Sequence, residues 1–241
     1  MALWFEDLKA QFILNFIEGD KWKWLVDGLI VTLQIAFFAV ILGTIIGVLV
    51  AVIRSSYDMN HKKMHGPMRP ILTVLNFISK IYLTVIRGTP VVVQLMIMYY
   101  IIFASSTNAV GIATMAFGIN SGAYLGEIFR SGIMSIEKGQ FEAGRSLGFG
   151  YIQTMWYIII PQALKNVLPS LCNEFIALLK ETSVAGYVTI TDLTRAGDLI
   201  RGRTFSAFMP LFAVALIYLV LVMILTSLVG KLERKLRTSD H

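Results

Sequence analysis

Residues 138–148 read Lys-Gly-Gln-Phe-Glu-Ala-Gly-Arg-Ser-Leu-Gly, a polar and glycine-rich stretch within a very apolar chain. A chain embedded in lipid places such a stretch outside the bilayer, because the hydrocarbon core offers no partners for exposed polar groups. The stretch therefore predicts a loop between two membrane spans, at about residues 135–165. Within it we expect a short helix over residues 142–147, followed by a tight turn at Gly148.

The composition around this stretch is that of a polytopic membrane protein. Of 241 residues, 56% are hydrophobic, and the mean hydropathy is +0.70. The net charge is +6, but the cations fall mostly next to apolar segments, where they serve as orientation signals and do not indicate nucleic-acid binding. The chain contains no phosphate-binding Gly-x-x-x-x-Gly-Lys-Ser/Thr motif, so any ATP must be handled by another polypeptide. We predict neither a metal site nor covalent chemistry.

Apolar runs long enough to cross a bilayer, about 20 residues each, predict five membrane spans. Residues 71–86 contain Asn76, Ser79 and Lys80, which make them a poor span alone. We expect these residues to form an amphipathic elbow at the cytoplasmic interface, followed by a kink at residues 87–90. The predicted spans are residues 25–53, a segment that ends at residue 103, and residues 111–134, 166–187 and 207–230.

Charges flanking the first and last spans predict the orientation. The segment before residue 25 carries a net charge of −1, the loop after residue 53 a net charge of +3, and residues 231–237 again +3. Positive residues favour the cytoplasmic side, so we expect the N-terminus outside and the C-terminus inside. The predicted division is an extracytoplasmic segment 1–24, a transmembrane domain 25–230 and a basic cytoplasmic tail 231–241. Residues 192–203, on the outer side, are expected to form a surface helix.

The polar stretch resembles the cytoplasmic coupling loop of bacterial ABC-importer permeases. Its pattern is Glu142-Ala143-Gly144, then Gly148, and finally Ile-x-Ile-Pro ending at Pro161, where the family commonly has Glu-Ala-Ala, Gly and Ile-x-Leu-Pro. Further strings in the same order resemble the branch that takes up polar amino acids, of the histidine, glutamine, arginine or glutamate type. They are Arg-Gly-Thr-Pro at 87–90 with Gln94, Gly-Ala-Tyr-Leu-Gly-Glu-Ile-Phe-Arg at 122–130, Pro-Gln-Ala-Leu at 161–164, Asn-Glu-Phe at 173–175 and Lys-Glu-Thr-Ser at 180–183.

This resemblance implies an all-α membrane protein of the type I ABC-importer permease fold, with five transmembrane helices and a cytoplasmic coupling helix. It further implies a site in the bacterial cytoplasmic membrane and a complex with two ATPase subunits, a second permease subunit, identical or homologous, and an extracytoplasmic amino-acid-binding protein. The chain itself would be no enzyme and would bind no cofactor, because ATP and Mg would be used by the ATPase. Its function would be to move a polar or charged amino acid inward by alternating access.

Coupling to the ATPase requires a short rigid helix that seats in a pocket of that subunit. Glu142 is expected at the start of this helix, where it would favour the positive end of the helix dipole and meet a cation of the ATPase. Pro161 is expected to end the segment that follows. The alternative interpretation of the Glu-Ala-Gly motif, taken alone, is an ordinary cytoplasmic loop with a capped helix and no role in coupling. The residues to which the resemblance assigns coupling are Glu142, Ala143, Gly144, Ser146, Leu147, Gly148 and Pro161.

Ionisable groups inside the bilayer mark candidate residues of the substrate pathway. Each costs about 2.5 to 3.5 kcal/mol at mid-depth, so it faces protein or water. Glu174, together with Asn173, is the leading candidate for the substrate pathway, because a carboxylate and an amide can hold the ammonium and polar groups of an amino acid. Gln94 and Lys180 are further candidates. The alternative for Glu174 is an interhelical tie to Lys180 or Arg130.

Four other residues are expected to be structural or to take part in gating. Arg87 and Pro90 belong to the predicted kink. Glu127 and Arg130 stand three residues apart on one helix face and can neutralise one another.

A secondary transporter driven by an ion gradient is the alternative function, since that class also places charges at mid-membrane. Internal repeats are common in that class, and no convincing repeat is found in this chain. The sequence does not specify which amino acid is carried.

Overall fold

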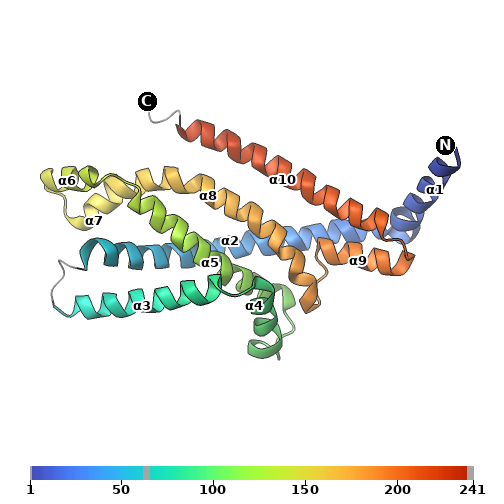
Figure 1. Cartoon of the computed structure of the whole chain (residues 1–241), viewed down its shortest axis with the longest axis horizontal. Helices are drawn as coiled ribbons and strands as arrows, with labels where there is room; N and C mark the ends of the chain where they lie inside the picture. The colour runs from blue at the N-terminus through green and yellow to red at the C-terminus, as the bar shows by residue number, and fades with distance from the viewer. Residues whose placement is uncertain (1, 62–65, 238–241) are drawn as a thin grey trace. The chain divides into compact units, whose positions relative to one another are not determined.

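The protein is described by a computed structural model, which covers residues 2–61 and 66–237 (Figure 1). All regular elements in these residues are helices. The α-helices are α1 (Ala2–Phe12), α2 (Lys21–Asn60), α3 (Met68–Arg87), α4 (Val91–Ile97), α5 (Ala109–Met134), α6 (Lys138–Ser146), α7 (Tyr151–Thr154), α8 (Ile160–Glu181), α9 (Leu193–Thr204) and α10 (Phe208–Arg237). Shorter 3-10 and π-helical turns are η1 (Ile13–Ile17), η2 (Glu18–Asp20), η3 (Met98–Ile102), η4 (Met155–Ile159) and η5 (Thr182–Val188).

The helices divide into two compact units, each built from three stretches of chain. The first unit comprises the N-terminal residues to Ala39, Val91–Phe117 and Ile176–Ser227. The second comprises Val40–Pro90, Gly118–Phe175 and the residues from Leu228 onward. The predicted tail begins inside α10, and its last four residues, 238–241, lie outside the described residues.

In the second unit, small residues bring α2 and α5 together. A Cβ added to Gly47 would lie 2.8 Å from the Leu125 Cβ, and one added to Gly122 would lie 2.9 Å from the Ile46 Cβ. Each helix thus presents glycine where the other presents a branched side chain. Close packing of this kind drives helix association in membranes, where the hydrophobic effect does not act between helices. The contact fixes α5, which contributes one wall of the candidate site.

In the first unit, α9 packs on the start of α2. The buried cluster includes Leu25, Leu193 and Ile200. The Asp192 carboxylate caps α9 by accepting hydrogen bonds from the backbone N–H groups of Thr194 (3.0 Å) and Arg195 (3.1 Å). Burial raises the pKa of this carboxyl, and the two backbone hydrogen bonds oppose that rise. The helix expected at 192–203 is therefore present, with one face buried.

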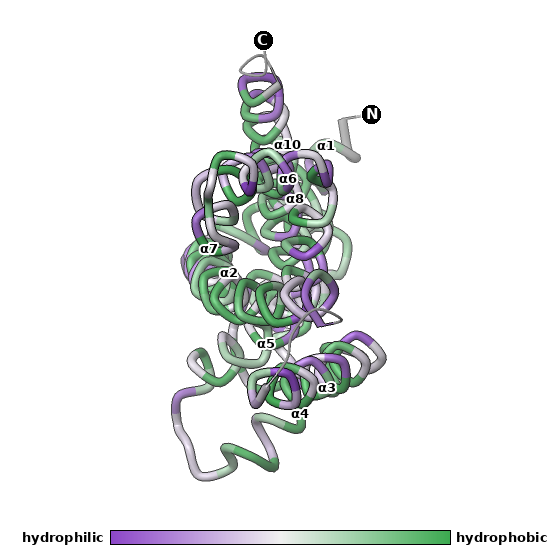
Figure 2. Tube along the Cα trace, turned by 90° about the vertical axis from the view of Figure 1, so that its left-hand side faces the viewer, coloured by the Kyte–Doolittle hydropathy of each residue, from purple (hydrophilic) through white to green (hydrophobic). Residues whose placement is uncertain are grey.

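The structure revises the expectation for residues 71–86. Among the residues that the structure describes, three helices are long and apolar enough to cross a membrane by length and composition: the helical run Phe5–Asn60, Met68–Arg87 and Phe208–Leu236. The middle one is α3, which the sequence analysis treated as a poor span. Its apolar side chains outweigh Asn76 and Ser79, which are buried within the unit. Figure 2 shows both hydrophilic and hydrophobic residues on α3.

The predicted kink at residues 87–90 is confirmed. α3 ends at Arg87, Gly88 to Pro90 are not helical, and the helix resumes at Val91. The helical run that follows, Val91–Ile102, has about 18 Å of helical rise and cannot cross a core of about 30 Å alone. A crossing that ends at residue 103 therefore has to include part of α3.

Candidate functional site

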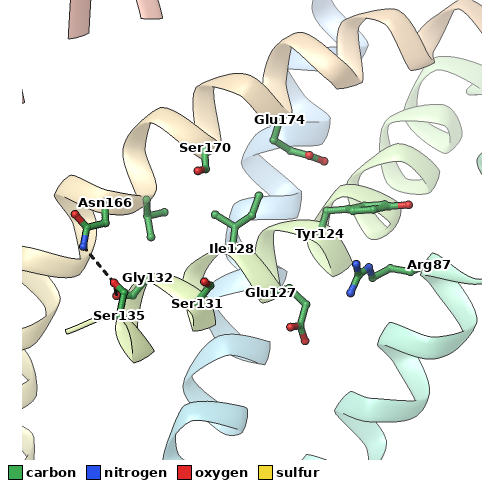
Figure 3. A pocket seen from close by; sticks show the side chains of 11 residues that line it. Arg87, Tyr124, Glu127, Ile128, Ser131, Gly132, Ser135, Asn166, Ser170 and Glu174 are labelled. Carbon is green, nitrogen blue, oxygen red and sulfur yellow. Dashed lines mark hydrogen bonds between the residues drawn. The ribbon is translucent and has the colours of Figure 1, made fainter. Parts of the chain in front are cut away.

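A cavity of about 630 Å³ lies in the second unit, between α3, α5 and α8 (Figure 3). Its volume is in the range of pockets that bind small molecules. Its lining joins two carboxylates and a guanidinium to several hydroxyl groups. The lining residues are Arg87, Tyr124, Glu127, Ile128, Ser131, Gly132, Ser135, Asn166, Val167, Ser170 and Glu174.

Two polar stripes form the facing walls. Asn166, Ser170 and Glu174 recur every four residues along α8 and line the cavity together, because residues four apart share a helix face. The same spacing joins Glu127 and Ser131 on α5 to Ser135 in the turn that follows it.

The two walls are linked near one end of the cavity. The Asn166 amide donates a hydrogen bond to the Ser135 hydroxyl (3.2 Å), drawn in Figure 3. Sequence reasoning missed the three serines and Asn166. The four-residue repeat of polar groups in apolar helices was the signal that could have found them.

Glu174 is both a cavity residue and an interhelical link. It is half-buried, and its Oε1 accepts a hydrogen bond from the Ser121 hydroxyl at 3.1 Å. Ser121 lies on α5 and is fully buried. The predicted tie to Arg130 is not formed, since the guanidinium of Arg130 is bound by Asp58 and Glu127. The carboxylate thus connects α8 to α5 while it faces the cavity.

Arg87 supplies positive charge to the same cavity. Its guanidinium carbon lies 5.4 Å from the centre of the Tyr124 ring, within the range of a cation–π interaction. From the sequence, Arg87 was expected to be structural, as part of a kink, or to take part in gating. The structure makes it the last residue of α3 and a lining residue, with Tyr124 holding its side chain. A cavity with separate positive and negative groups matches the charge pattern of a zwitterion.

A charge network joins α2 to α5 beside the cavity. Arg54 lies 3.2 Å from Glu127, Glu127 lies 3.6 Å from Arg130, and Arg130 lies 2.7 Å from Asp58. The pair Glu127–Arg130 is the one predicted from the spacing of three residues. The four side chains are 15–29% exposed, and their charges sum to zero. Attraction between the opposite charges therefore offsets part of the free-energy cost of removing each of them from water.

The remaining predicted pathway residues do not line this cavity. Asn173 is exposed on α8. Gln94 and Lys180 belong to the first unit. Gln94 is half-buried on α4, and Lys180 is exposed in the last turn of α8. Pro90 is the last residue of the break between α3 and α4.

The predicted coupling helix is α6, and its end is closed by a Schellman motif. Gly148 has φ +80°, the left-handed conformation that glycine adopts without strain. The Phe149 N–H donates to the Gly144 carbonyl (3.0 Å), and the Gly148 N–H donates to the Arg145 carbonyl (2.9 Å). The expectation of a tight turn at Gly148 is confirmed.

Two expectations about this segment are wrong. Helix α6 begins at Lys138, with Glu137 at its N-cap, so Glu142 lies beyond the first turn and gains little from the helix dipole. Pro161 does not end the segment, because the helical residues continue from Tyr151 to Glu181. The π-helical turn η4 widens the backbone just before Pro161, and the proline lies at the second position of α8, where it is tolerated.

Helix α6 has two different faces. Lys138, Phe141, Glu142 and Arg145 line a cavity shared with the end of α2. Ala143, Ser146 and Leu147 lie on the other side and are exposed, with Leu147 72% exposed. The exposed face thus carries three of the residues to which the resemblance assigns coupling, whereas Glu142 lies on the side of the cavity.

Gly144 is buried where α6 meets α7, and this explains a residue at which the motif departs from the common form. A Cβ at this position would lie 2.7 Å from Cγ2 and 2.8 Å from Oγ1 of Thr154. Thr154 is itself buried, and its hydroxyl donates to the Gly150 carbonyl (3.1 Å). Glycine at 144 and threonine at 154 therefore fit one another.

This fit predicts coupling between two substitutions. Gly144→Ala should lower the thermal stability of the segment, because the clash of about 1–3 kcal/mol exceeds the gain in helix propensity of about 1 kcal/mol. Thr154→Ala in the same chain should recover most of the loss, with a coupling energy of about 1–2 kcal/mol in a double-mutant cycle. Additive effects of the two changes would contradict the packing.

A comparison with known proteins settles the family. The profile of the family described as "Binding-protein-dependent transport system inner membrane component" matches residues 70–238. The chain belongs to this family. The permease is 35% identical to the arginine transport system permease protein ArtQ of Bacillus subtilis, over 90% of its own length and 94% of that protein. It is 31% identical to the L-cystine transport system permease protein TcyB of Bacillus subtilis, over 92% and 90%.

Solved structures agree with the fold. A crystal structure of an amino acid ABC transporter with histidines contains a chain that matches the permease with a TM-score of 0.78 and 36% identity, over 91% of the permease and 98% of that chain. The permease therefore has the type I ABC-importer permease fold and is a membrane component of a binding-protein-dependent transporter. It is an ABC-importer permease and not a secondary transporter, and ATP hydrolysis belongs to a separate subunit.

Proposed function

We propose that the permease carries a polar or charged amino acid inward across the bacterial cytoplasmic membrane, with the cavity between α3, α5 and α8 as part of its path. The observation that carries this proposal is the charge arrangement of the cavity. Glu174 and Glu127 offer carboxylates, Arg87 offers a guanidinium, and serine hydroxyls lie between them. An amino acid presents an ammonium and a carboxylate that need such partners once water is removed.

The roles of the lining residues follow from their chemistry. Glu174 would bind the ammonium group or a cationic side chain, and Arg87 would bind the carboxylate. The hydroxyls of Ser131, Ser135 and Ser170 would replace water along the path.

The proposed complex contains two ATPase subunits, a second permease subunit, identical or homologous, and an extracytoplasmic amino-acid-binding protein. The N-terminus would lie outside and the C-terminus in the cytoplasm, as the charge bias of the flanking segments indicates. ATP and Mg would bind to the ATPase, and this chain would bind no cofactor. Closure of the ATPases, received through the exposed face of α6, would open the path outward, and release of nucleotide products would return it inward.

Reconstitution tests this proposal. The purified complex in proteoliposomes should accumulate an amino acid only with internal ATP and the binding protein outside, and vanadate should block uptake. Competition among basic, amide, acidic and sulfur-containing amino acids would identify the substrate class. Uptake that an ion gradient drives without ATP, or the absence of uptake for every amino acid tested, would contradict the proposal.

A further inference from the structure

Two more cavities lie in the second unit, where α6 and α7 meet the end of α2. Their volumes are about 450 and 440 Å³. Both are lined by Asn60, Arg145 and Tyr151. They are separate from the cavity of the proposed substrate path, with which they share no lining residue.

The 450 Å³ cavity is amphipathic. One side is polar and is made by Ser56, Asn60, Arg145 and Tyr151. The other side is the apolar start of α3, made by Met68, Ile71, Leu72 and Leu75. We call this cavity the α3 groove.

Charge in the α3 groove is uncompensated. None of the described residues that line it is acidic, and Arg145 brings a positive charge. Within residues 2–61 and 66–237, the structure records no hydrogen bond or ion pair for the Arg145 guanidinium. The neighbouring 440 Å³ cavity differs, because Asp58 and Glu142 also line it. An anion would therefore bind in the α3 groove in preference to its neighbour.

The apolar wall of the α3 groove continues onto a surface suited to lipid. Met68, Ile71 and Leu75 are 60%, 54% and 41% exposed, and Ile78 and Val85 extend the exposed apolar surface along α3. Exposed apolar surface of this extent on a membrane protein contacts hydrocarbon. Met68, Ile71 and Leu75 belong to the first turns of α3, next to the polar end of α2, so the groove lies where the bilayer surface begins.

We propose that the α3 groove binds one anionic phospholipid of the cytoplasmic leaflet. The phosphate would accept hydrogen bonds from Arg145 and Tyr151, and an acyl chain would lie along Ile71 and Leu75. A basic side chain beside apolar side chains at this boundary offers such a lipid both a partner for its charge and a wall for its acyl chain. The leaflet assignment rests on the proposed orientation, in which α6 is cytoplasmic.

The lipid would act on coupling through α6. Arg145 lies on the face of α6 opposite the exposed Ala143 and Leu147. A headgroup bound there would hold α6 against the ends of α2 and α3 while the exposed face remains open for the ATPase. Anionic lipid would thus be a structural ligand of the coupling segment.

Native mass spectrometry of the purified complex tests the proposal directly. After incubation with equal amounts of phosphatidylglycerol and phosphatidylcholine, the unmodified complex should retain phosphatidylglycerol preferentially. Arg145→Gln should lower that preference about fivefold, the effect of removing one basic group from an anionic lipid surface. Leu72→Trp should also lower retention, because it fills the groove without changing charge.

Lys231→Gln is the matched control, because Lys231 is exposed on α10 and lies outside the groove. It should leave the lipid preference unchanged. Equal retention by Arg145→Gln and the unmodified complex would overturn the proposal. Loss of the ATPase from Arg145→Gln with unchanged lipid preference would show instead that Arg145 contacts the ATPase. Lipid binding is measured without transport, so a failed uptake assay and a failed lipid assay remain distinct results.

Discussion

Replacing Glu174 with glutamine should weaken the response to substrate by about 10- to 100-fold. The substitution keeps the size of the side chain and a carbonyl oxygen that can accept from Ser121, but removes the negative charge from the cavity. Hydrogen bonds to charged groups contribute about 1.5–3 kcal/mol, which sets the size of the effect. The measurement is the substrate concentration that half-saturates uptake by the reconstituted complex.

Ser121→Ala separates the two roles of Glu174. Loss of the serine removes its hydrogen bond from α5 to Glu174 while the carboxylate stays in the cavity. If Glu174 binds substrate, Ser121→Ala should lower Tm with a small change in half-saturation. Glu174→Gln should instead change half-saturation strongly and Tm little. If both variants lower Tm alike and neither changes half-saturation, Glu174 is an interhelical tie only.

Glu142→Lys is expected to abolish coupling, with ATP-driven uptake reduced more than tenfold in a chain that still inserts. Glu142 is exposed in the middle of α6, so the change disturbs no buried contact. A lysine would oppose a cation of the ATPase and would add a third positive charge beside Lys138 and Arg145. The ratio of amino acid imported to ATP hydrolysed measures the effect.

Glu137→Lys is the control, because it makes the same change of charge as Glu142→Lys at another exposed position of the segment. Glu137 is exposed at the N-cap of α6, and its side chain makes no capping hydrogen bond. The change should cost at most about 1 kcal/mol of local helix stability through the dipole and should leave most of the uptake intact. Normal coupling in Glu142→Lys, or an equal loss in both variants, would remove the specific role assigned to Glu142.

The elements that sequence could predict are those with a strong local signal. Glycine at 148 marked the end of α6, because few other residues adopt its left-handed backbone. The Arg-Gly-Thr-Pro string marked the break after α3, and the charge spacing marked Glu127–Arg130. The start of α6 was missed by four residues, since Glu137 and Lys138 carry no distinct start signal and Glu142 was mistaken for one.

The substrate cavity was only partly predictable, because it depends on contacts between distant stretches. Glu174 stood out by its charge in an apolar helix. Ser121, Ser131 and Ser135 did not, because a serine in a membrane helix commonly bonds within its own helix. Arg87 was assigned to a kink because its partner Tyr124 lies on another helix, a contact that no local pattern reveals. The fit of Gly144 to Thr154 has the same origin.

Site-directed labelling of α6 tests the central claim most directly, namely that this helix docks a separate ATPase on the inner side of the membrane. Leu147→Cys in a Cys172→Ser background places a single thiol on the exposed face of α6. A membrane-impermeant maleimide should label this thiol in inside-out vesicles stripped of ATPase, should fail to label it in intact cells, and should be blocked when the ATPase is bound again. Labelling from outside intact cells, or labelling that the ATPase does not reduce, would contradict the account.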